Sequence, residues 1–315
     1  MGLEQDSDQG DSKLLSATRT TKAYLVQFKA DASKDLIHQA LEGETYRLIG
    51  HSDRRLVSMV TEDLEAFKAR AAHLLTRVEE DAIRTIQRTV NDPYASQQWA
   101  LDTLNLYPAW DITTGSRSVF VAILDTGVSR SHPDLLQADI REGWDYLASG
   151  GGIVWDDPEG HGTAVTGVIA ATANNGIGIA GLAWKSAIIP FKVLDKEGKG
   201  STSDSTQAIY DAADAGCKVI NISFGCQQAV KAEEDAIQYA LDKGAIVVAA
   251  AGNDENSEYN YPASYPRVIS VAAIDREKKR AYFSNYNDRV SLTAPGQEIM
   301  TLQLGGNYVN THGTS

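Results

Sequence analysis

The chain has 315 residues, 43% of them hydrophobic and 23% charged, proportions typical of a globular protein and unlike those of a disordered chain or a collagen. No apolar run approaches the roughly 18 residues that a membrane-spanning helix needs, so no membrane partner is expected. Asp and Glu number 42 against 29 Lys and Arg, and the resulting net charge of −13 repels phosphate backbones. We therefore expect no nucleic-acid partner, and we expect a monomer.

The first part of the chain predicts a small α+β domain. Residues 1–21 are polar and are expected to form a flexible segment. After them, strand and helix patterns follow in the order β-α-β-β-α-β, the ferredoxin-like arrangement. The predicted elements are a strand at 22–28, a helix at 33–41, strands at 45–50 and 55–60, a helix at 61–74 capped by Thr61, and a last strand at 82–90.

The remainder of the chain predicts a larger α/β domain. Residues 91–101, interrupted by Pro93, are interpreted as an exposed linker. Beyond them, continuous apolar runs alternate with helical stretches, which is typical of a buried parallel sheet, so we expect a doubly wound, mainly parallel α/β fold. The strands are predicted at 119–125, 186–194, 217–225, 245–253 and 268–275, and the helices at 161–173, 205–216 and 229–244. In such a fold the site lies beyond the carboxyl ends of the strands.

The two cysteines are not expected to form a disulfide with each other. Cys217 and Cys226 stand at the two ends of a predicted strand. Nine steps of extended chain cover about 30 Å, whereas disulfide-bonded Cα atoms lie within about 7 Å of each other.

Four polar residues stand where such a site would lie. Asp125 ends a strand in a D-T-G motif, His161 lies between two glycines at the start of a helix, Asn253 follows a strand, and Ser315 ends the chain. Each signal is weak alone: an Asp or His there is often a cap, and an Asn often forms a turn. D-T-G also marks aspartic proteases, but such an enzyme needs a second motif, and no other D-T-G or D-S-G occurs.

Together these residues identify a resemblance. The order Asp, His, Asn, Ser, with its surrounding segments, closely resembles the subtilisin-like serine proteases over nearly all of residues 92–315. The matching segments are ILDTGVSRSHPDL (123–135), GHGTAVTGVIAA (160–171), NNGIGIAGLAW (174–184), VINISFG (219–225), VVAAAGN (247–253), YPASYPRVISVAA (261–273) and HGTS (312–315).

The resemblance implies a role for each residue of the catalytic group. Asp125 would orient the imidazole, His161 would act as general base and then general acid, and Ser315 would be the nucleophile. Asn253 would donate a hydrogen bond to the oxyanion.

The resemblance also implies how a peptide substrate is held. Ser223, Phe224 and Gly225 would pair with the backbone of the peptide. Ala250, Ala251 and Gly252 would line the pocket for the side chain before the scissile bond. Their small or apolar character favours large apolar side chains, whereas the nearby acidic residues Asp254, Glu255 and Glu258 leave a basic preference as the alternative.

A calcium site is a further implication. The stretch Asn174–Ile179 is similar to the calcium loop of the family, although such a sequence can also form a plain turn. The side chains of Asp92, Asp134 and Asn175 and the carbonyls of Ala173, Ile177 and Ile179 would bind Ca²⁺, which prefers oxygen ligands.

The resemblance predicts a precursor made of three parts: the flexible segment 1–21, a propeptide at 22–91 and a catalytic domain at 92–315. We expect cleavage within 86–92, with that segment lying in the active-site cleft beforehand; a permanent regulatory domain is the alternative. Because the family continues beyond the nucleophile, we expect the catalytic domain to be incomplete at Ser315 and a chain ending there not to turn over.

The predicted function is a self-processing serine endopeptidase that hydrolyses peptide or protein substrates by acyl transfer. The alternatives are a catalytically silent relative that binds peptides and, less supported, an aspartic protease built on Asp125. The propeptide favours export. The N-terminal 22 residues lack the apolar segment of a signal peptide, which leaves a cytoplasmic location as the alternative.

Overall fold

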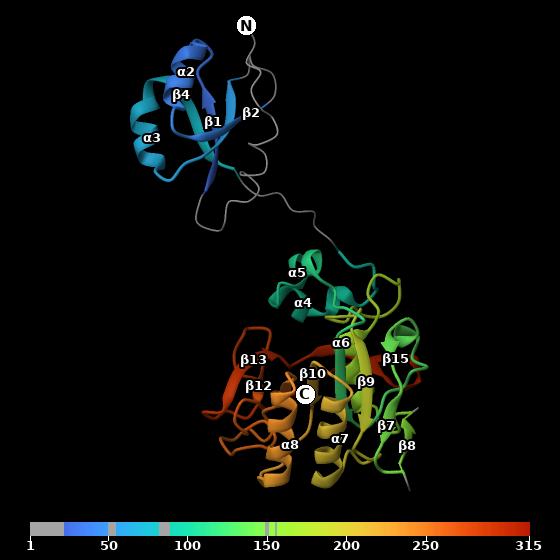
Figure 1. The fold of residues 1–315 in the computed structure, drawn as a ribbon. Helices are drawn as coiled ribbons and strands as arrows, with labels where there is room; N and C mark the ends of the chain where they lie inside the picture. The colour runs from blue at the N-terminus through green and yellow to red at the C-terminus, as the bar shows by residue number, and fades with distance from the viewer. Residues whose placement is uncertain (1–21, 50–54, 82–88, 149–150, 155) are drawn as a thin grey trace. The chain divides into compact units, whose positions relative to one another are not determined.

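The computed structural model describes residues 22–49, 55–81, 89–148, 151–154 and 156–315. The chain divides into two compact units, Met1–Ile86 and Gln87–Ser315, and each is described by itself (Figure 1). The predicted flexible segment 1–21 lies outside the described residues. No helix in the described ranges combines the length and the apolar character needed to cross a bilayer.

The first unit has the predicted order of elements. Its antiparallel sheet has the strand order β2-β3-β1-β4. The elements are β1 (Ala23–Phe28), α2 (Lys34–Ala40), β2 (Thr45–Ile49), β3 (Leu56–Val60), α3 (Leu64–Ala71), the short 3₁₀ helix η1 (Ala72–Leu74) and β4 (Leu75–Glu80). Val26, Val57 and Phe67 are fully buried between the sheet and the helices and form a core of their own.

Two predictions for this unit are wrong. The last strand is β4, not 82–90: residues 82–88 lie outside the described residues, and 89–90 are not in a strand. β4 escapes detection because it is an edge strand on which only Leu75 and Val78 are partly buried. The cap of α3 is Asp63, whose side chain accepts a hydrogen bond from the Ala66 N–H at 2.9 Å, rather than Thr61.

The second unit is the predicted doubly wound α/β fold. Its main sheet has the strand order β13-β12-β11-β10-β5-β9-β7-β8, with β6 also paired to β9, and every pair is parallel except β7 with β8. The strands are β5 (Phe120–Asp125), β6 (Asp139–Ile140), β7 (Gly143–Asp145), β8 (Gly152–Val154), β9 (Ala187–Lys192), β10 (Val219–Ile222), β11 (Ile246–Ala250), β12 (Ile269–Ile274) and β13 (Val290–Pro295).

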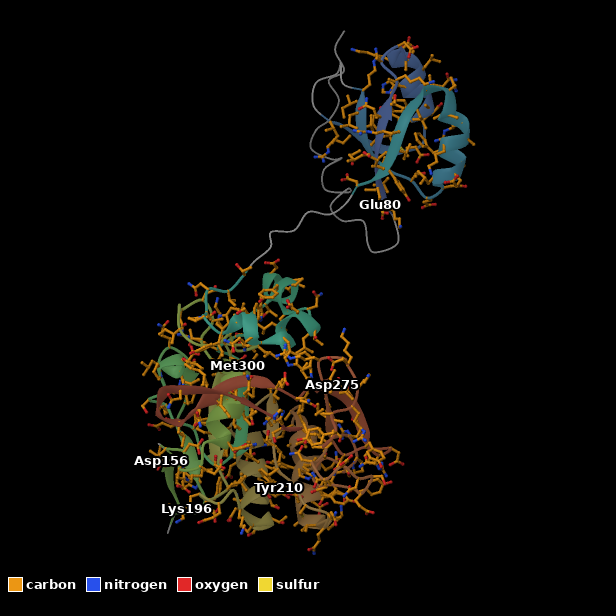
Figure 2. All side chains as sticks on the ribbon, turned by 180° about the vertical axis from the view of Figure 1, so that it is seen from behind. Glu80, Asp156, Lys196, Tyr210, Asp275 and Met300 are labelled. Atoms are coloured by element: carbon orange, nitrogen blue, oxygen red, sulfur yellow. The ribbon has the colours of Figure 1, made fainter. Side chains whose placement is uncertain are left out.

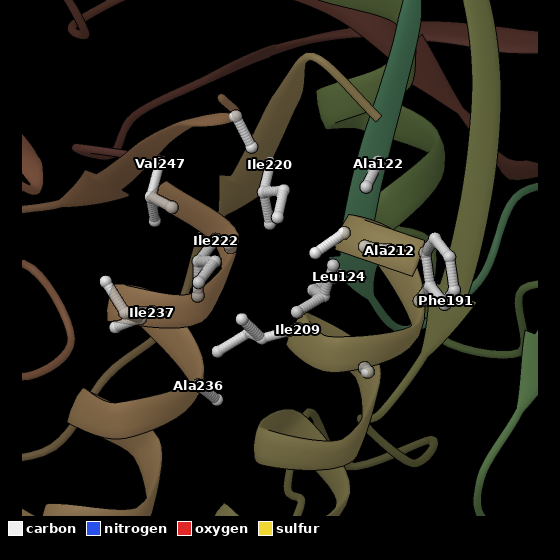
Figure 3. Close-up of a cluster of buried hydrophobic side chains, with 14 of the residues drawn as sticks. Ala122, Leu124, Phe191, Ile209, Ala212, Ile220, Ile222, Ala236, Ile237 and Val247 are labelled. Atoms are coloured by element: carbon white, nitrogen blue, oxygen red, sulfur yellow. The ribbon is translucent and has the colours of Figure 1, made fainter. Parts of the chain in front are cut away.

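Helices cover both faces of this sheet. The long helices are α6 (His161–Ala170), α7 (Thr202–Asp214) and α8 (Lys231–Asp242). Alternate residues of β5 point to opposite faces: Ala122 and Leu124 join the core with α7 and α8, drawn in Figure 3, whereas Val121 and Ile123 join the core with α6. This alternation leaves the strands apolar on both faces, which explains why the parallel sheet could be predicted.

Shorter elements complete the unit and were not predicted. They are η2 (Ala95–Gln97), α4 (Trp99–Thr103), α5 (Leu106–Ile112), η3 (Pro133–Leu135), β14 (Ile299–Gln303), η4 (Leu304–Gly306) and β15 (Asn307–Thr311). β14 and β15 form an antiparallel hairpin. Met300 of β14, labelled in Figure 2, is buried in the core beneath α6.

The interpretation of residues 91–101 as an exposed linker is wrong. Asp92, Gln98 and Leu101 are all buried. The Gln98 side chain makes two hydrogen bonds to the backbone of Ala180, and the Trp99 indole N–H is 3.1 Å from the carbonyls of residues 297 and 298. Partners so distant in sequence give no local signal, so a polar stretch containing a proline resembles a linker.

The two cysteines do not form a disulfide with each other, as predicted, and both are free. Cys217 is buried below the start of β10, and Cys226 is exposed beyond its end.

Candidate active site

Three neighbouring parallel strands bring the predicted residues to one edge of the sheet. β11, β10 and β5 lie side by side. Asp125 is the last residue of β5, Ser223 directly follows β10, and Asn253 lies three residues after β11. The carboxyl ends of parallel strands meet at one edge, where the backbone leaves the ladder and polar side chains can converge.

Asp125 and His161 form a hydrogen-bonded pair. The Nδ1 atom of His161 is 2.8 Å from Oδ1 of Asp125, which also accepts a bond of 2.8 Å from the Thr126 N–H. Asp125 is completely buried, whereas the His161 side chain is 37% exposed, so one end of the imidazole is accessible. Gly162 makes the approach possible: a Cβ on it would lie 2.1 Å from the Gly127 carbonyl oxygen.

The charges around His161 favour its protonated form. Burial alone lowers the pKa of the imidazole. The hydrogen bond and the negative charge of Asp125 outweigh burial, and Glu159 and Asp157 add to their effect, so the pKa of His161 lies above its ordinary value. Glu159 is also in direct contact, because its Oε2 accepts the His161 backbone N–H at 2.7 Å.

Sequence reasoning missed Asp157, which joins the two segments that carry the pair. Its buried carboxylate accepts bonds from the hydroxyls of Thr126, at 2.8 Å, and Thr163, at 2.6 Å. It also accepts three backbone N–H groups, those of residues 159, 160 and 163. The carboxylate thereby fixes the start of α6 against the end of β5. An acidic residue four positions before His161 was the only sequence signal for it.

Ser315 lies near the pair without bonding to it. Its hydroxyl donates to the Ser223 carbonyl oxygen at 3.1 Å. Within the described residues no hydrogen bond joins it to His161. Both side chains nevertheless line one cavity of about 100 Å³, whose walls include Val168 and Pro295.

The amide of Asn253 is held in one orientation. Its Oδ1 accepts both the backbone N–H and the hydroxyl of Thr314, each at 2.9 Å. This leaves the Nδ2 hydrogens free to donate. A Cβ placed on Gly313 would lie 3.6 Å from the Ser315 nitrogen, 3.7 Å from its Oγ and 3.8 Å from Asn253 Nδ2. Two donors and a hydroxyl therefore surround one open spot beside Gly313, which suits a developing oxyanion.

The two segments predicted to hold the substrate flank this spot. The backbone groups of Phe224 and Gly225 make no hydrogen bond to any described residue and are free to pair with an extended peptide. Ala250 and Ala251 are buried at the end of β11. Gly252 has φ +112, and its N–H donates to the Thr314 hydroxyl at 3.1 Å.

Two of the predicted calcium ligands, Asp92 and Asp134, contact the loop at 173–179 that contains the other four. Asp92 and Asp134 are buried, and neither forms an ion pair with Lys or Arg in the described part of the chain. Asp92 accepts the N–H groups of Asn174, at 2.8 Å, and Asn175, at 3.2 Å. Asp134 accepts the Asn175 amide at 3.0 Å and the Ile179 N–H at 2.8 Å.

The two carboxylates of this loop act on each other, and His132 is the basic side chain whose charge acts on Asp134. Burial raises the pKa of Asp134, the hydrogen bonds from Ile179 and Asn175 lower it, the charge of Asp92 raises it, and the charge of His132 lowers it. Among the described residues, no three His, Cys, Asp or Glu side chains cluster to hold a metal. Any cation here would therefore depend on carbonyl and amide oxygens as well. The carbonyls of Ala173 and Ile177 come from the same loop.

Comparisons with known proteins agree on one family. The family model described as "Subtilase family" matches residues 116–315. The thermophilic serine proteinase of Bacillus sp. strain AK1 is 42% identical over 72% of this chain and 56% of its own length. Thermitase of Thermoactinomyces vulgaris is 40% identical over 72% of this chain and 80% of its own length. The chain thus spans little more than half of the Bacillus relative.

A solved structure extends the likeness to the fold. A chain titled as a protease of Pseudoalteromonas arctica matches with a TM-score of 0.67 and 32% sequence identity, over 72% of this chain and 83% of its own.

Proposed function

The chain belongs to the subtilase family, and from that premise we propose that it is a serine endopeptidase that cleaves peptide bonds by acyl transfer. The observation that carries the proposal is the 2.8 Å bond between Asp125 and His161, in a site that also contains the Ser315 hydroxyl. The match covers 56% of the length of the Bacillus relative, so the activity of the whole protein is part of this proposal.

In the proposed reaction, the Ser315 hydroxyl attacks the scissile carbonyl while Nε2 of His161 takes its proton. Asp125 holds the imidazole through Nδ1 and stabilises the imidazolium as it forms. The backbone N–H of Ser315 and Nδ2 of Asn253 donate to the oxyanion of the tetrahedral intermediate. His161 then protonates the leaving amine, and a water molecule, activated by the same imidazole, hydrolyses the acyl-enzyme.

The substrate is proposed to be an extended peptide that adds a strand beside Ser223–Gly225. The side chain before the scissile bond would lie against Ala250, Ala251 and Gly252. Apolar side chains suit these walls, and the acidic residues 254, 255 and 258 remain the basis of the alternative basic preference at this position.

The aspartic-protease hypothesis finds no support in the geometry, because Asp125 bonds His161 rather than a second aspartate. A silent peptide-binding relative is favoured by one observation: the Ser315 hydroxyl bonds Ser223 instead of His161. Labelling of the full-length protein with a fluorophosphonate separates the two readings. Labelling that disappears in Ser315→Ala and His161→Ala supports the protease, and an unlabelled wild-type protein supports the silent relative.

We also propose that Asp92, Asp134, Asn175 and the carbonyls of Ala173, Ile177 and Ile179 hold Ca²⁺. Two buried carboxylates that form no ion pair with Lys or Arg among the described residues fit a cation. Because Asn175 directs its amide hydrogens at Asp134, binding requires this amide to turn its oxygen inward. The ion would screen the repulsion between the carboxylates and fix the loop. It has no part in the proposed acyl transfer.

The unit formed by β1–β4 is proposed to be a propeptide that inhibits the catalytic unit and assists its folding, with cleavage within 86–92. Residues 86–88 lie outside the described residues. The prediction that 86–92 lies in the active-site cleft is wrong for residues 90–92. Val90 packs against the cluster that contains Trp110, and Asn91 and Asp92 bond the loop at 174–176. None of these three residues lines the cavity at His161. A parallel sheet built from non-local contacts folds slowly, which gives a folding aid a physical purpose.

Intact mass of the full-length protein over time, with calcium, tests this processing. Loss of about 90 N-terminal residues that stops in Ser315→Ala supports self-cleavage, whereas a Ser315→Ala variant that is still shortened contradicts it. Export is the proposed location and the cytoplasm the alternative, since one relative, from Paenibacillus polymyxa, is named an intracellular serine protease.

A further inference from the structure

A second cavity, of about 250 Å³, lies beside the segment proposed to pair with the substrate. Its walls come from the end of β9, the loop before α7, the first turn of α7, the start of α8 and residues 224–226. Leu194, Phe224 and Tyr261 give it apolar walls, and Ser201 and Thr202 also line it.

The cavity contains a carboxylate without a cationic partner. Glu233 of α8 lines it and is only 5% exposed. Its Oε1 accepts the Ser205 hydroxyl at 3.0 Å, but that hydroxyl is also 3.0 Å from the Thr202 carbonyl, so one proton serves two acceptors. In the described part of the chain, Glu233 forms no ion pair, although its neighbour Glu234 pairs with Lys231.

The charge of the Glu233 carboxylate is poorly stabilised in this buried position. Burial raises the pKa of Glu233, while the hydroxyls of Ser205 and Tyr265 lower it. Neutral donors replace only part of the hydration that a charged carboxylate loses, whereas a cation beside it restores the balance. Lys199 also lines the cavity, but its side chain is exposed and its backbone is bonded to Asp195. Among the described residues that line the cavity, none forms an ion pair with Glu233, so a basic side chain of a substrate can supply the counter-charge.

The position of the cavity relates it to the substrate. Ser223, whose carbonyl accepts the Ser315 hydroxyl, marks the reacting centre. The cavity begins one and two residues further on, at Phe224 and Gly225. Each residue of an extended strand advances about 3.3 Å. A peptide paired with 223–225 therefore brings to the cavity the side chain of a residue two to four positions before the scissile bond.

We propose that this cavity receives a lysine or arginine side chain of the substrate and that Glu233 is its counter-ion. The inference rests on the proposed endopeptidase function and adds to it a specificity-determining residue. The aliphatic stem of the side chain packs between Leu194, Phe224 and Tyr261, and the charged end meets the carboxylate.

Quenched fluorescent peptides test this on the full-length protein. Each pair of peptides differs only in carrying lysine or norleucine, in turn at the second, third and fourth position before the scissile bond. At one position, we expect kcat/KM for lysine to exceed that for norleucine by about tenfold. Glu233→Gln should bring this ratio to about one and Glu233→Leu should invert it, whereas Glu234→Gln, one residue along the same helix, should leave it unchanged.

The ratio of two substrates is independent of how much of a variant is folded, so a destabilised variant still gives an answer. Equal rates for lysine and norleucine at all three positions, or a preference that survives in Glu233→Gln, would overturn the inference. Binding of the same peptides to Ser315→Ala, followed by fluorescence anisotropy, separates it from the proposed function. If wild type cleaves neither peptide but Ser315→Ala binds the lysine peptide more tightly through Glu233, the endopeptidase proposal fails and the cavity assignment stands.

Discussion

Thr314 holds Asn253 through two hydrogen bonds to a single atom, since both its N–H and its hydroxyl lie 2.9 Å from Oδ1. An amide fixed at its oxygen presents its nitrogen in one direction. Thr314 thus orients Asn253, the side-chain donor proposed for the oxyanion. Because Thr314 directly precedes Ser315, the same stretch of backbone positions both the donor and the proposed nucleophile.

Replacing Thr314 by valine removes the hydroxyl bond and keeps the shape of the side chain. We expect kcat to fall about tenfold with little change in KM, because an oxyanion donor acts on the transition state. Asn253→Ala should cost about 10² to 10³ in kcat, the usual effect of removing such a donor. Steady-state kinetics of the full-length protein measure both, and Thr314→Ser is the control that keeps the hydroxyl. An unimpaired Thr314→Val enzyme would contradict the orienting role.

Gly313→Ala should abolish activity while leaving the fold intact. The added methyl meets its neighbours at 3.6 to 3.8 Å, which is ordinary contact, yet it fills the spot where an oxyanion would lie about 3 Å from its donors. We expect kcat/KM to fall by about 100-fold or more at an unchanged thermal midpoint. Gly152→Ala, also with room for its methyl at 3.8 Å, is the matched control. Retained activity in Gly313→Ala would place the oxyanion elsewhere.

The acid limb of the pH–rate profile should follow His161. The general base must be neutral, so kcat/KM rises with pH through the pKa of His161, which Asp125, Glu159 and Asp157 hold above its ordinary value against the effect of burial. Glu159→Gln keeps an acceptor for the His161 N–H but removes a negative charge. The pKa should fall and the acid limb should move to lower pH, whereas Glu142→Gln, an exposed carboxylate, should not move it. A shift to higher pH would refute the assignment.

Asp157→Asn should destabilise the second unit. An amide cannot accept all five hydrogen bonds that reach this carboxylate, and its own hydrogens would face the donors. We expect the free energy of unfolding to fall by about 3 kcal/mol, measured with urea. The exposed Glu277→Gln should change it by less than about 0.5 kcal/mol. Equal stability of the two variants would mean that the carboxylate is dispensable.

Calcium should raise the thermal midpoint through the loop at 173–179. A ligand present at about 100 times its dissociation constant stabilises the folded state by about 2.7 kcal/mol. The midpoint in calcium should therefore exceed that in EGTA, and Asp134→Asn should remove most of the difference. Glu142→Gln should preserve it. A calcium effect that persists in Asp134→Asn would locate the ion at another site.

The sequence predicted what local patterns encode. Strands such as β5 and β11, which are apolar on both faces, predict a parallel sheet, and the glycines beside His161 predict a helix start close to the end of a strand. Edge strands escaped detection: β4 exposes most of its side chains and β13 exposes half of them. Asp157 and Glu233 escaped for another reason. In the sequence, each looks like an ordinary surface acid. Tertiary packing buries Asp157 against Thr126, which follows β5, and buries Glu233 against Ser205 of α7.

The hydrogen bonds of residues 91–101 determine the properties of the N-terminus that a cleavage just before residue 91 would create. Asn91 and Asp92 are bonded to the 174–176 loop, and Trp99 is bonded to the carbonyls of residues 297 and 298. A mature enzyme beginning at this point would have its first residues already fixed to the body of the molecule. It would offer no frayed tail to aminopeptidases, which favours long survival in a protease-rich surrounding.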